Sequence, residues 1–399
     1  MSRLACAGVV VAWACACSSS SAGPPALDAG GADATGAAAE AGVDGAAADA
    51  RVVANGACLV ERGALPAATL QSDPGPWLER ATLERAAGLL VERVRYRSGG
   101  LVIVGMVCRP DDAVPHPVLV VNHGGFAGIG ADWTSAEALC RAAARNGLVV
   151  MQSSYRGEDG SEGQVEICAG EVDDVAAMLA IVRAQPYALG DHVVAFGGSH
   201  GGCISARLAL RDPSLRAVAE WFGPSDFPLI YRSWEGQIAG GEPSPSCAGV
   251  QPACQDLHAC LLTLAENSLG GTPAAAPASY RARSWVEDVA ALKVPALIMH
   301  GTVDSVVPLE QSCEVRAALT AAGRSLQAWY LDPALAVQTS TTICGGDYRA
   351  DALPSGSAPG TWSAANVYLF VLEGQGHGFT GPAATLAGTL TLSFLASHL

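Results

Sequence analysis

The sequence is poor in charge, and basic residues are scarcer than acidic ones. Only 15% of its 399 residues are charged, with 23 Lys and Arg against 38 Asp and Glu, which gives a formal net charge of −15 at pH 7. No cluster of basic side chains occurs in the chain. Because polyanions bind positively charged surfaces, nucleic acid and anionic membrane surfaces are not expected as partners.

Long apolar runs and C-x-x-C cysteine pairs are also missing. No run reaches the ~18 apolar residues of a transmembrane helix, and the sequence contains no internal repeat. No C-x-x-C pair occurs among the 13 cysteines, so a structural zinc site is not expected. The chain is long enough for one large α/β domain or two smaller ones, and half of its residues are hydrophobic, which is enough for a sizeable core. Neither a metal nor another cofactor is expected.

The N-terminus has the pattern of an export signal. Arg3 precedes a short apolar core at residues 7–14, and small residues and cysteines follow. Residues 1–17 resemble a bacterial lipoprotein signal with Cys17 as the lipidated residue, although Ala14 stands where Leu is usual. An ordinary secretory signal is the alternative. We expect an exported protein that contacts a membrane only through an N-terminal lipid anchor.

A low-complexity stretch separates this signal from the folded part. Residues 18–54 are rich in Ala, Gly, Ser and Asp and cannot bury enough surface to order, which predicts a flexible tether. Residues 55–399 are predicted to form the folded domain. Three of the 13 cysteines lie in the export segment, and the remaining ten suggest disulfides in an exported protein.

Short apolar strands alternate with helical periodicity through most of the folded part. This alternation predicts an α/β fold with a mostly parallel sheet covered by helices on both faces. Residues 91–97 and 101–109 flank Ser98-Gly99-Gly100 and predict a β-hairpin. Further strands are expected at residues 117–122, 148–153, 193–196, 217–222, 295–300 and 367–372, and helices at residues 133–145, 172–184, 203–211, 310–322 and 384–398.

One strand turns sharply into a helix at Gly197-Gly198-Ser199-His200-Gly201. The apolar run 193–196 precedes this turn, and residues with helical spacing follow it. Glycines on both sides let the strand and helix approach closely around a strained serine, and the helix N-terminus favours negative charge there. The pattern is the Gly-x-Ser-x-Gly nucleophile elbow.

A long insertion follows the elbow. Residues 228–288 show little strand pattern and are predicted to form a cap over the site. They contain Cys247, Cys254 and Cys260, which cannot all pair with one another. At least one must stay free or bond elsewhere, for example to Cys313 or Cys344. A second segment, residues 333–363, is expected to be loop.

A serine nucleophile needs a base to take its proton and a carboxylate to orient that base. In this arrangement the acid and the histidine follow the serine in chain order, each after a strand. Asp304 and His377 meet that condition and are the predicted acid and base. The rival acids Asp226 and Glu373 also follow strands, but Asp226 lies before the insertion and Glu373 is too near the histidine.

The tetrahedral intermediate of acyl transfer needs two N–H donors for its oxyanion, and losing one typically costs about 3–4 kcal/mol. The first is expected from His200, whose side chain should pack or meet solvent. The second is expected from the loop His123-Gly124-Gly125-Phe126, which matches the HGGG-type loop in its first three residues. Gly125 is the favoured donor and Phe126 the alternative.

Together the motifs resemble the catalytic domain of prolyl-oligopeptidase-type α/β-hydrolases. The resemblance covers roughly residues 91–399 and rests on Gly-Gly-Ser-His-Gly-Gly, His-Gly-x-x-Asp-x-x-Val-Pro, His-Gly-Gly-Phe, Tyr-Arg-Gly-x-x-Gly and Gly-His-Gly-Phe. It implies the α/β-hydrolase fold, with Ser199 as nucleophile, Asp304 as acid and His377 as base. That superfamily includes acylaminoacyl- and dipeptidyl-peptidases and many carboxylesterases.

The resemblance departs from the peptidases at one point. They usually carry an N-terminal β-propeller, for which the tether and residues 55–87 leave no room, and this favours an esterase. We therefore expect an exported serine hydrolase that cleaves small carboxylic esters through an acyl-enzyme. A propeller-free aminopeptidase or dipeptidyl-peptidase acting on short peptides is the alternative. A non-catalytic surface-binding lipoprotein is the alternative outside this class. The oligomeric state is left open.

Overall fold

The computed structural model describes residues 65–72, 75–126, 128–242, 256–339, 342–358, 360–363 and 365–399. The predicted export signal with Cys17 and the predicted tether lie outside these residues, as do Cys247 and Cys254. Within the described ranges, no helix has the length and apolar character needed to cross a membrane.

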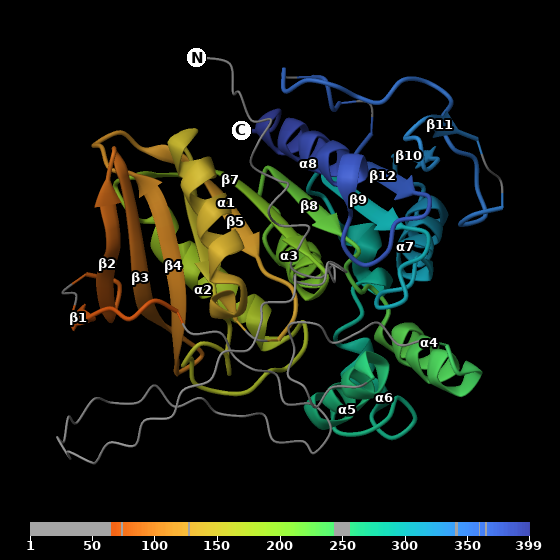
Figure 1. Ribbon diagram of the computed structural model, residues 1–399, viewed down its shortest axis with the longest axis horizontal. Coiled ribbons are helices and arrows are strands. Elements are labelled where there is room, and N and C mark those ends of the chain that lie inside the picture. The colour runs from red at the N-terminus through yellow and green to blue at the C-terminus, as the bar shows by residue number, and fades with distance from the viewer. Residues whose placement is uncertain are drawn as a thin grey trace, which may run out of the picture.

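The described strands form a single twelve-stranded sheet (Figure 1), in the order β1-β2-β3-β4-β6-β5-β7-β8-β9-β12-β10-β11. The strands from β6 to β10 in this order are parallel, β1 to β4 join antiparallel at one edge, and β11 is antiparallel at the other. The predicted mostly parallel sheet is therefore confirmed. The strands are β1 (Gln71–Ser72), β2 (Glu79–Ala86), β3 (Leu89–Ser98), β4 (Leu101–Pro110), β5 (His116–Asn122), β6 (Val149–Ser153), β7 (Ala188–Gly198), β8 (Ala217–Trp221), β9 (Ala296–Gly301), β10 (Leu326–Leu331), β11 (Val337–Gln338) and β12 (Val367–Leu372).

Helices cover both faces of this sheet (Figure 1). Helices α1 and α8 share one buried core with the sheet, and α2, α3 and α7 share the other. In β12, Val367, Leu369 and Val371 face the second core, and the residues that alternate with them face the first. This double burial explains the unbroken apolar run. The helices are α1 (Trp133–Arg145), α2 (Gly170–Arg183), α3 (His200–Arg211), α4 (Phe227–Gly240), α5 (Leu257–Leu269), α6 (Pro277–Arg281), α7 (Glu310–Ala321) and α8 (Gly381–Ala396), with 3-10 turns η1 (Ile129–Asp132) and η2 (Val286–Ala291).

The sequence pattern did not reveal every element. Strand β2 lies in a mixed stretch for which no element was predicted, and it pairs with β3 at the antiparallel edge. Strand β10 was also missed, because Gln327 interrupts its apolar run and its first two residues are only half-buried. The predicted insertion is helical where it is described, and Figure 1 shows α4, α5 and α6 grouped outside the two helical layers.

Three disulfides join described residues: Cys108–Cys140, Cys168–Cys203 and Cys313–Cys344. Cys260 is also disulfide-bonded. The suggestion that a cysteine of the insertion reaches Cys313 or Cys344 is wrong, because these two bond to each other across helix α7 and the loop after β11.

We expect the Cys108–Cys140 disulfide, which ties β4 to α1, to contribute to stability and not to activity. It closes a loop with a sequence separation of 32, so it restricts the unfolded chain. Replacing both cysteines with Ala should lower the free energy of unfolding by about 2–4 kcal/mol. Urea unfolding of the variant and the wild type without reductant measures this. An unchanged midpoint and slope would contradict it.

Candidate active site

Ser199 occupies the turn between β7 and α3 in a strained conformation. Its φ of 54° and ψ of −127° lie where residues other than glycine are rarely found, and such strain costs on the order of 1–3 kcal/mol. Added side chains at Gly197 and Gly201 would collide with the carbonyls of Gly201 and Asn122, so only glycines allow this approach. The Ser199 N–H donates to the Trp221 carbonyl at 2.9 Å and fixes the turn.

The structure brings the three predicted triad residues together. Asp304 follows β9 and His377 follows β12, two neighbouring parallel strands. The distance from His377 Nε2 to Ser199 Oγ is 3.0 Å, and that from His377 Nδ1 to Asp304 Oδ2 is 2.8 Å. Since a carboxylate only accepts, Nδ1 carries the imidazole proton and Nε2 can accept from the serine hydroxyl.

The carboxylate of Asp304 is fully buried and fixed on both oxygens. Its Oδ1 accepts from the N–H groups of Val306 and Val307, each at 2.9 Å. His300 lies behind it, where its Nε2–H donates to the Val307 carbonyl at 2.7 Å and its Nδ1 accepts from Ser312 at 2.8 Å. Burial lowers the pKa of His300. A neutral imidazole thus braces the turn that carries the acid.

The two rival acids are engaged elsewhere. Asp226 is the N-cap of α4 and accepts from the Leu229 N–H at 2.8 Å. Glu373 hydrogen-bonds Tyr330, whose pKa is raised to about 12, chiefly by burial and then by this bond. Asp304 is the carboxylate hydrogen-bonded to His377.

The predicted oxyanion donors lie around the elbow. The N–H of His200 is the first of helix α3. Within the described chain, no acceptor bonds to this N–H or to the N–H groups of Gly125 and Phe126. The loop after β5 approaches closely, because an added Cβ on Gly124 would lie 3.2 Å from Ser199 Cβ. The choice between Gly125 and Phe126 stays a prediction.

The side chain of His200 is more constrained than the sequence suggested. It is buried, with Nδ1 3.1 Å from the Gly125 carbonyl and Nε2 3.0 Å from the N–H of Cys168. Cys168 in turn is bonded to Cys203, which lies in the same helix as His200. Sequence reasoning missed these links, because Cys168 and Gly125 are distant in the chain.

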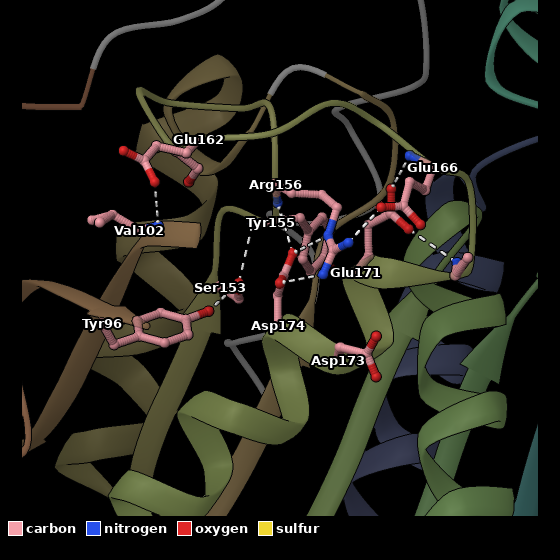
Figure 2. A network of polar contacts seen from close by, with 12 residues as sticks. Tyr96, Val102, Ser153, Tyr155, Arg156, Glu162, Glu166, Glu171, Asp173 and Asp174 are labelled. Atoms are coloured by element: carbon pink, nitrogen blue, oxygen red, sulfur yellow. Dashed lines mark hydrogen bonds and ion pairs between the residues drawn. The ribbon is translucent and has the colours of Figure 1, made fainter. Parts of the chain in front are cut away.

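A polar network holds the loop between β6 and α2 (Figure 2). Arg156 donates to Asp174 through its backbone N–H, Nε and Nη2, at 2.8, 3.0 and 2.9 Å, and its Nη1 bonds Glu166. The buried Glu171 carboxylate accepts from three backbone N–H groups of the same loop. The Tyr-Arg-Gly motif therefore anchors this loop to α2, the helix that carries Asp174 and Glu171.

A buried carboxyl lies beside the elbow and was also missed. Glu220 on β8 accepts from the Gly223 N–H at 2.7 Å, and burial raises its pKa to about 8. Added side chains at Gly202 or Gly223 would press against Oε2, so the carboxyl occupies the space between α3 and this turn. The turn also carries Phe222, whose ring lies 4.6 Å from that of His377. The sequence signal that could have revealed this carboxyl is a single acidic residue inside an otherwise apolar strand.

A nucleophile elbow at the carboxyl edge of a mostly parallel sheet defines the α/β-hydrolases, and the protein is a serine hydrolase of that fold. Two family models match it. The model of the X-Pro dipeptidyl-peptidase (S15 family) matches residues 99–239, and that of the prolyl oligopeptidase family (S9) matches residues 247–334. The chain is thus similar to the S15 family over one part of its length and to the S9 family over another.

Individual relatives are distant. The chain is 24% identical over 236 residues to the uncharacterized peptidase YtmA of Bacillus subtilis (strain 168), covering 59% of this chain and 81% of that protein. The acylaminoacyl peptidase of Pyrococcus horikoshii has a TM-score of 0.52 at 16% identity, over 77% of this chain and 41% of its own. The chain thus spans about two fifths of that peptidase's length. Acetyl xylan esterase 1 from Thermoanaerobacterium sp. JW/SL YS485 has a TM-score of 0.50 at 16% identity, over 82% of this chain and 86% of its own.

The raised pKa of Glu220 predicts a pH-dependent effect of Glu220→Gln. The folded protein holds this proton up to about pH 8, whereas an unfolded glutamate ionises near pH 4.5. Ionisation of the unfolded chain therefore lowers the wild type's stability as pH rises between these values, by at most ~1.4 kcal/mol per pH unit. The amide of the variant can still accept from the Gly223 N–H and carries no such linkage.

The variant should thus gain stability relative to the wild type from pH 5 to pH 8. Urea unfolding of both proteins at pH 5, 6.5 and 8 measures the difference, in which shared titrations cancel. A difference that is constant with pH would show that Glu220 is ionised in the folded protein.

Proposed function

We propose that Ser199, His377 and Asp304 form a catalytic triad that hydrolyses carboxylic esters through an acyl-enzyme. The hydrogen-bonded chain from Asp304 through His377 to Ser199 carries this proposal. Ser199 Oγ attacks the ester carbonyl while His377 Nε2 takes its proton, and His377 then protonates the leaving alcohol. Water activated by the same nitrogen releases the acid and restores the serine.

The negative charge of each tetrahedral intermediate falls near the start of α3. We assign the His200 N–H as one donor and the N–H of Gly125, or alternatively Phe126, as the second. Helix α3 adds its dipole, because its N-terminus points at the elbow. Removing one such donor typically costs about 3–4 kcal/mol of transition-state stabilisation.

Substrate choice is proposed to depend on the insertion, residues 228–288, acting as a cap. Helix α4 bonds to the turn after Asp304, with Trp234 Nε1 donating to the Val306 carbonyl at 2.7 Å. Helix α5 bonds to the same turn, since His258 Nε2 donates to the Ser305 carbonyl at 2.9 Å. These contacts place the helical insertion against the loop that holds the acid.

Small esters and short peptides are the two candidate substrate classes, and different relatives support each. Likeness over most of both chains to an acetyl xylan esterase supports small esters. The S9 and S15 matches and a relative named as a peptidase support short peptides as the second candidate. Comparing kcat/KM for a p-nitrophenyl acyl ester series with that for aminoacyl p-nitroanilides tests this. Higher values throughout the anilides would replace the ester proposal with the peptidase one.

The triad predicts a specific pattern of losses. Ser199→Ala and His377→Ala should each lower kcat by at least ~10⁴-fold, and the double variant should be little worse, because triad members act as a unit. Ser363→Ala, at an exposed serine, is the matched control. Circular dichroism and unfolding midpoints check that the fold is kept. Near-native turnover by Ser199→Ala would refute the triad.

We also propose that the protein is exported and anchored through a lipid on Cys17. Cys17→Ser should release it from membranes or stop its processing, while activity persists in the folded domain. Fractionation and the mass of the N-terminal peptide measure this. One acyl chain binds membranes only marginally, so stable anchoring requires the several chains of a bacterial lipoprotein. A soluble wild-type protein with an unmodified N-terminus would contradict the proposal.

A further inference from the structure

The imidazole of His200 links two loops on either side of the elbow. The N–H of Cys168 donates to its Nε2 at 3.0 Å, so Nε2 carries no proton. Nδ1 must then carry it and donates to the carbonyl of Gly125 at 3.1 Å. The residue is 3% exposed, and burial lowers the pKa of His200 to about 4, so the ring stays neutral in one tautomer.

On one side, this hydrogen bond fixes the loop proposed to supply the second oxyanion donor. Gly125 is exposed and has a φ of +70°, and among the described residues the His200 ring is the side chain that bonds its carbonyl. Because a peptide unit is planar, a bond to the Gly125 carbonyl also sets the direction of the Phe126 N–H. The Phe126 ring packs on the imidazole, with centroids 4.6 Å apart.

On the other side, Cys168 presents its N–H from a strained backbone. Ile167 and Cys168 both have positive φ, at 56° and 55°, which residues with side chains rarely adopt. Two restraints hold them there. The Glu171 carboxylate accepts from the Ile167 N–H at 3.0 Å, and the disulfide ties Cys168 to Cys203, which lies in α3.

We propose that His200 is a positioning residue for the loop after β5, which is proposed to supply the second oxyanion donor. We propose also that the Cys168–Cys203 disulfide keeps the hydrogen bond from His200 to Gly125 in place. The inference deepens the proposed function and rests on it. Reduction by a dithiol transfers two electrons and two protons, breaks the S–S bond and leaves two thiols. Hydrolysis should therefore depend on the oxidised state of this disulfide.

Three substitutions of His200 separate positioning from packing. In His200→Asn the amide nitrogen stands near the place of Nδ1 and can still donate to Gly125. His200→Gln keeps an acceptor for Cys168 but loses that donor, and His200→Phe keeps only the ring packing. We expect His200→Phe and His200→Gln to lower kcat by roughly 10- to 100-fold, less than the ~10²–10³-fold for a whole donor. KM should change little, and His200→Asn should recover most of kcat.

A kcat for His200→Phe within twofold of the wild type, or equal losses in the Phe and Asn variants, would overturn the inference. Ser199→Ala, measured alongside, separates this result from the proposed function. If Ser199→Ala is inactive while His200→Phe is fully active, only the positioning role fails. If Ser199→Ala is active, the triad itself fails.

The disulfide is tested against a matched pair. Cys168–Cys203 and Cys108–Cys140 have similar sequence separations, 35 and 32, so removing either should shift the unfolding midpoint by similar amounts. Cys168→Ala/Cys203→Ala should lower kcat, whereas Cys108→Ala/Cys140→Ala should keep it. Adding His200→Phe to the first pair should cause little further loss, because both act through one hydrogen bond. Equal kcat in the two cysteine pairs would overturn the role of the disulfide.

Mild reduction of the intact protein provides a second readout if the cysteine variants fold poorly. Reduced samples are alkylated and the labelled peptides quantified by mass. Loss of kcat should follow alkylation of Cys168 and Cys203, and reoxidation before alkylation should restore it. Full activity in protein whose Cys168 is completely alkylated would contradict the proposal.

Discussion

The backbone of α3 meets the ends of β5 and β7 at van der Waals distance around Ser199, and the other site residues are arranged about this contact. Gly201 lies against the carbonyl of Asn122 so closely that no side chain could replace its hydrogen. The serine is held at a positive φ because strand and helix leave it no relaxed alternative. Since β5 and β7 are neighbours in the sheet, the same contact brings the loop after β5 to Ser199.

Buried polar groups fix the loops near Ser199 that apolar packing alone does not hold in place. The loop between β6 and α2 has an irregular backbone, so its N–H groups need acceptors other than a strand ladder. The two oxygens of Glu171 accept from three of these N–H groups, and Arg156 joins the loop to Asp174 (Figure 2). Glu220 lies against Gly202 of α3 and accepts from the Gly223 N–H in the turn that carries Phe222. A buried polar group is stable only when its hydrogen bonds are made, so each of these groups requires a particular partner.

The sequence revealed those features that depend on local order along the chain. Ser199, Asp304 and His377 were identified because each follows a strand, and parallel strands deliver their following loops to one edge of the sheet. The hairpin of β3 and β4 was equally local. By contrast, His200 bonds Cys168 and Gly125 at separations of 32 and 75 residues. No spacing rule encodes such contacts, and β10 is defined less by its own pattern than by its register with β12.

The attachment of α4 and α5 to the turn after Asp304 has a consequence for selectivity. Trp234 and His258 donate to carbonyls of the same turn whose N–H groups hold the acid. A bulky ligand that displaces these helices must also strain that turn, because the hydrogen bonds connect them directly. A displacement of the turn would then move Asp304 and, through its hydrogen bond, the imidazole of His377. For the proposed triad, discrimination between ligands by size would then appear in kcat, because His377 would be misaligned with Ser199, rather than in how tightly each ligand is held.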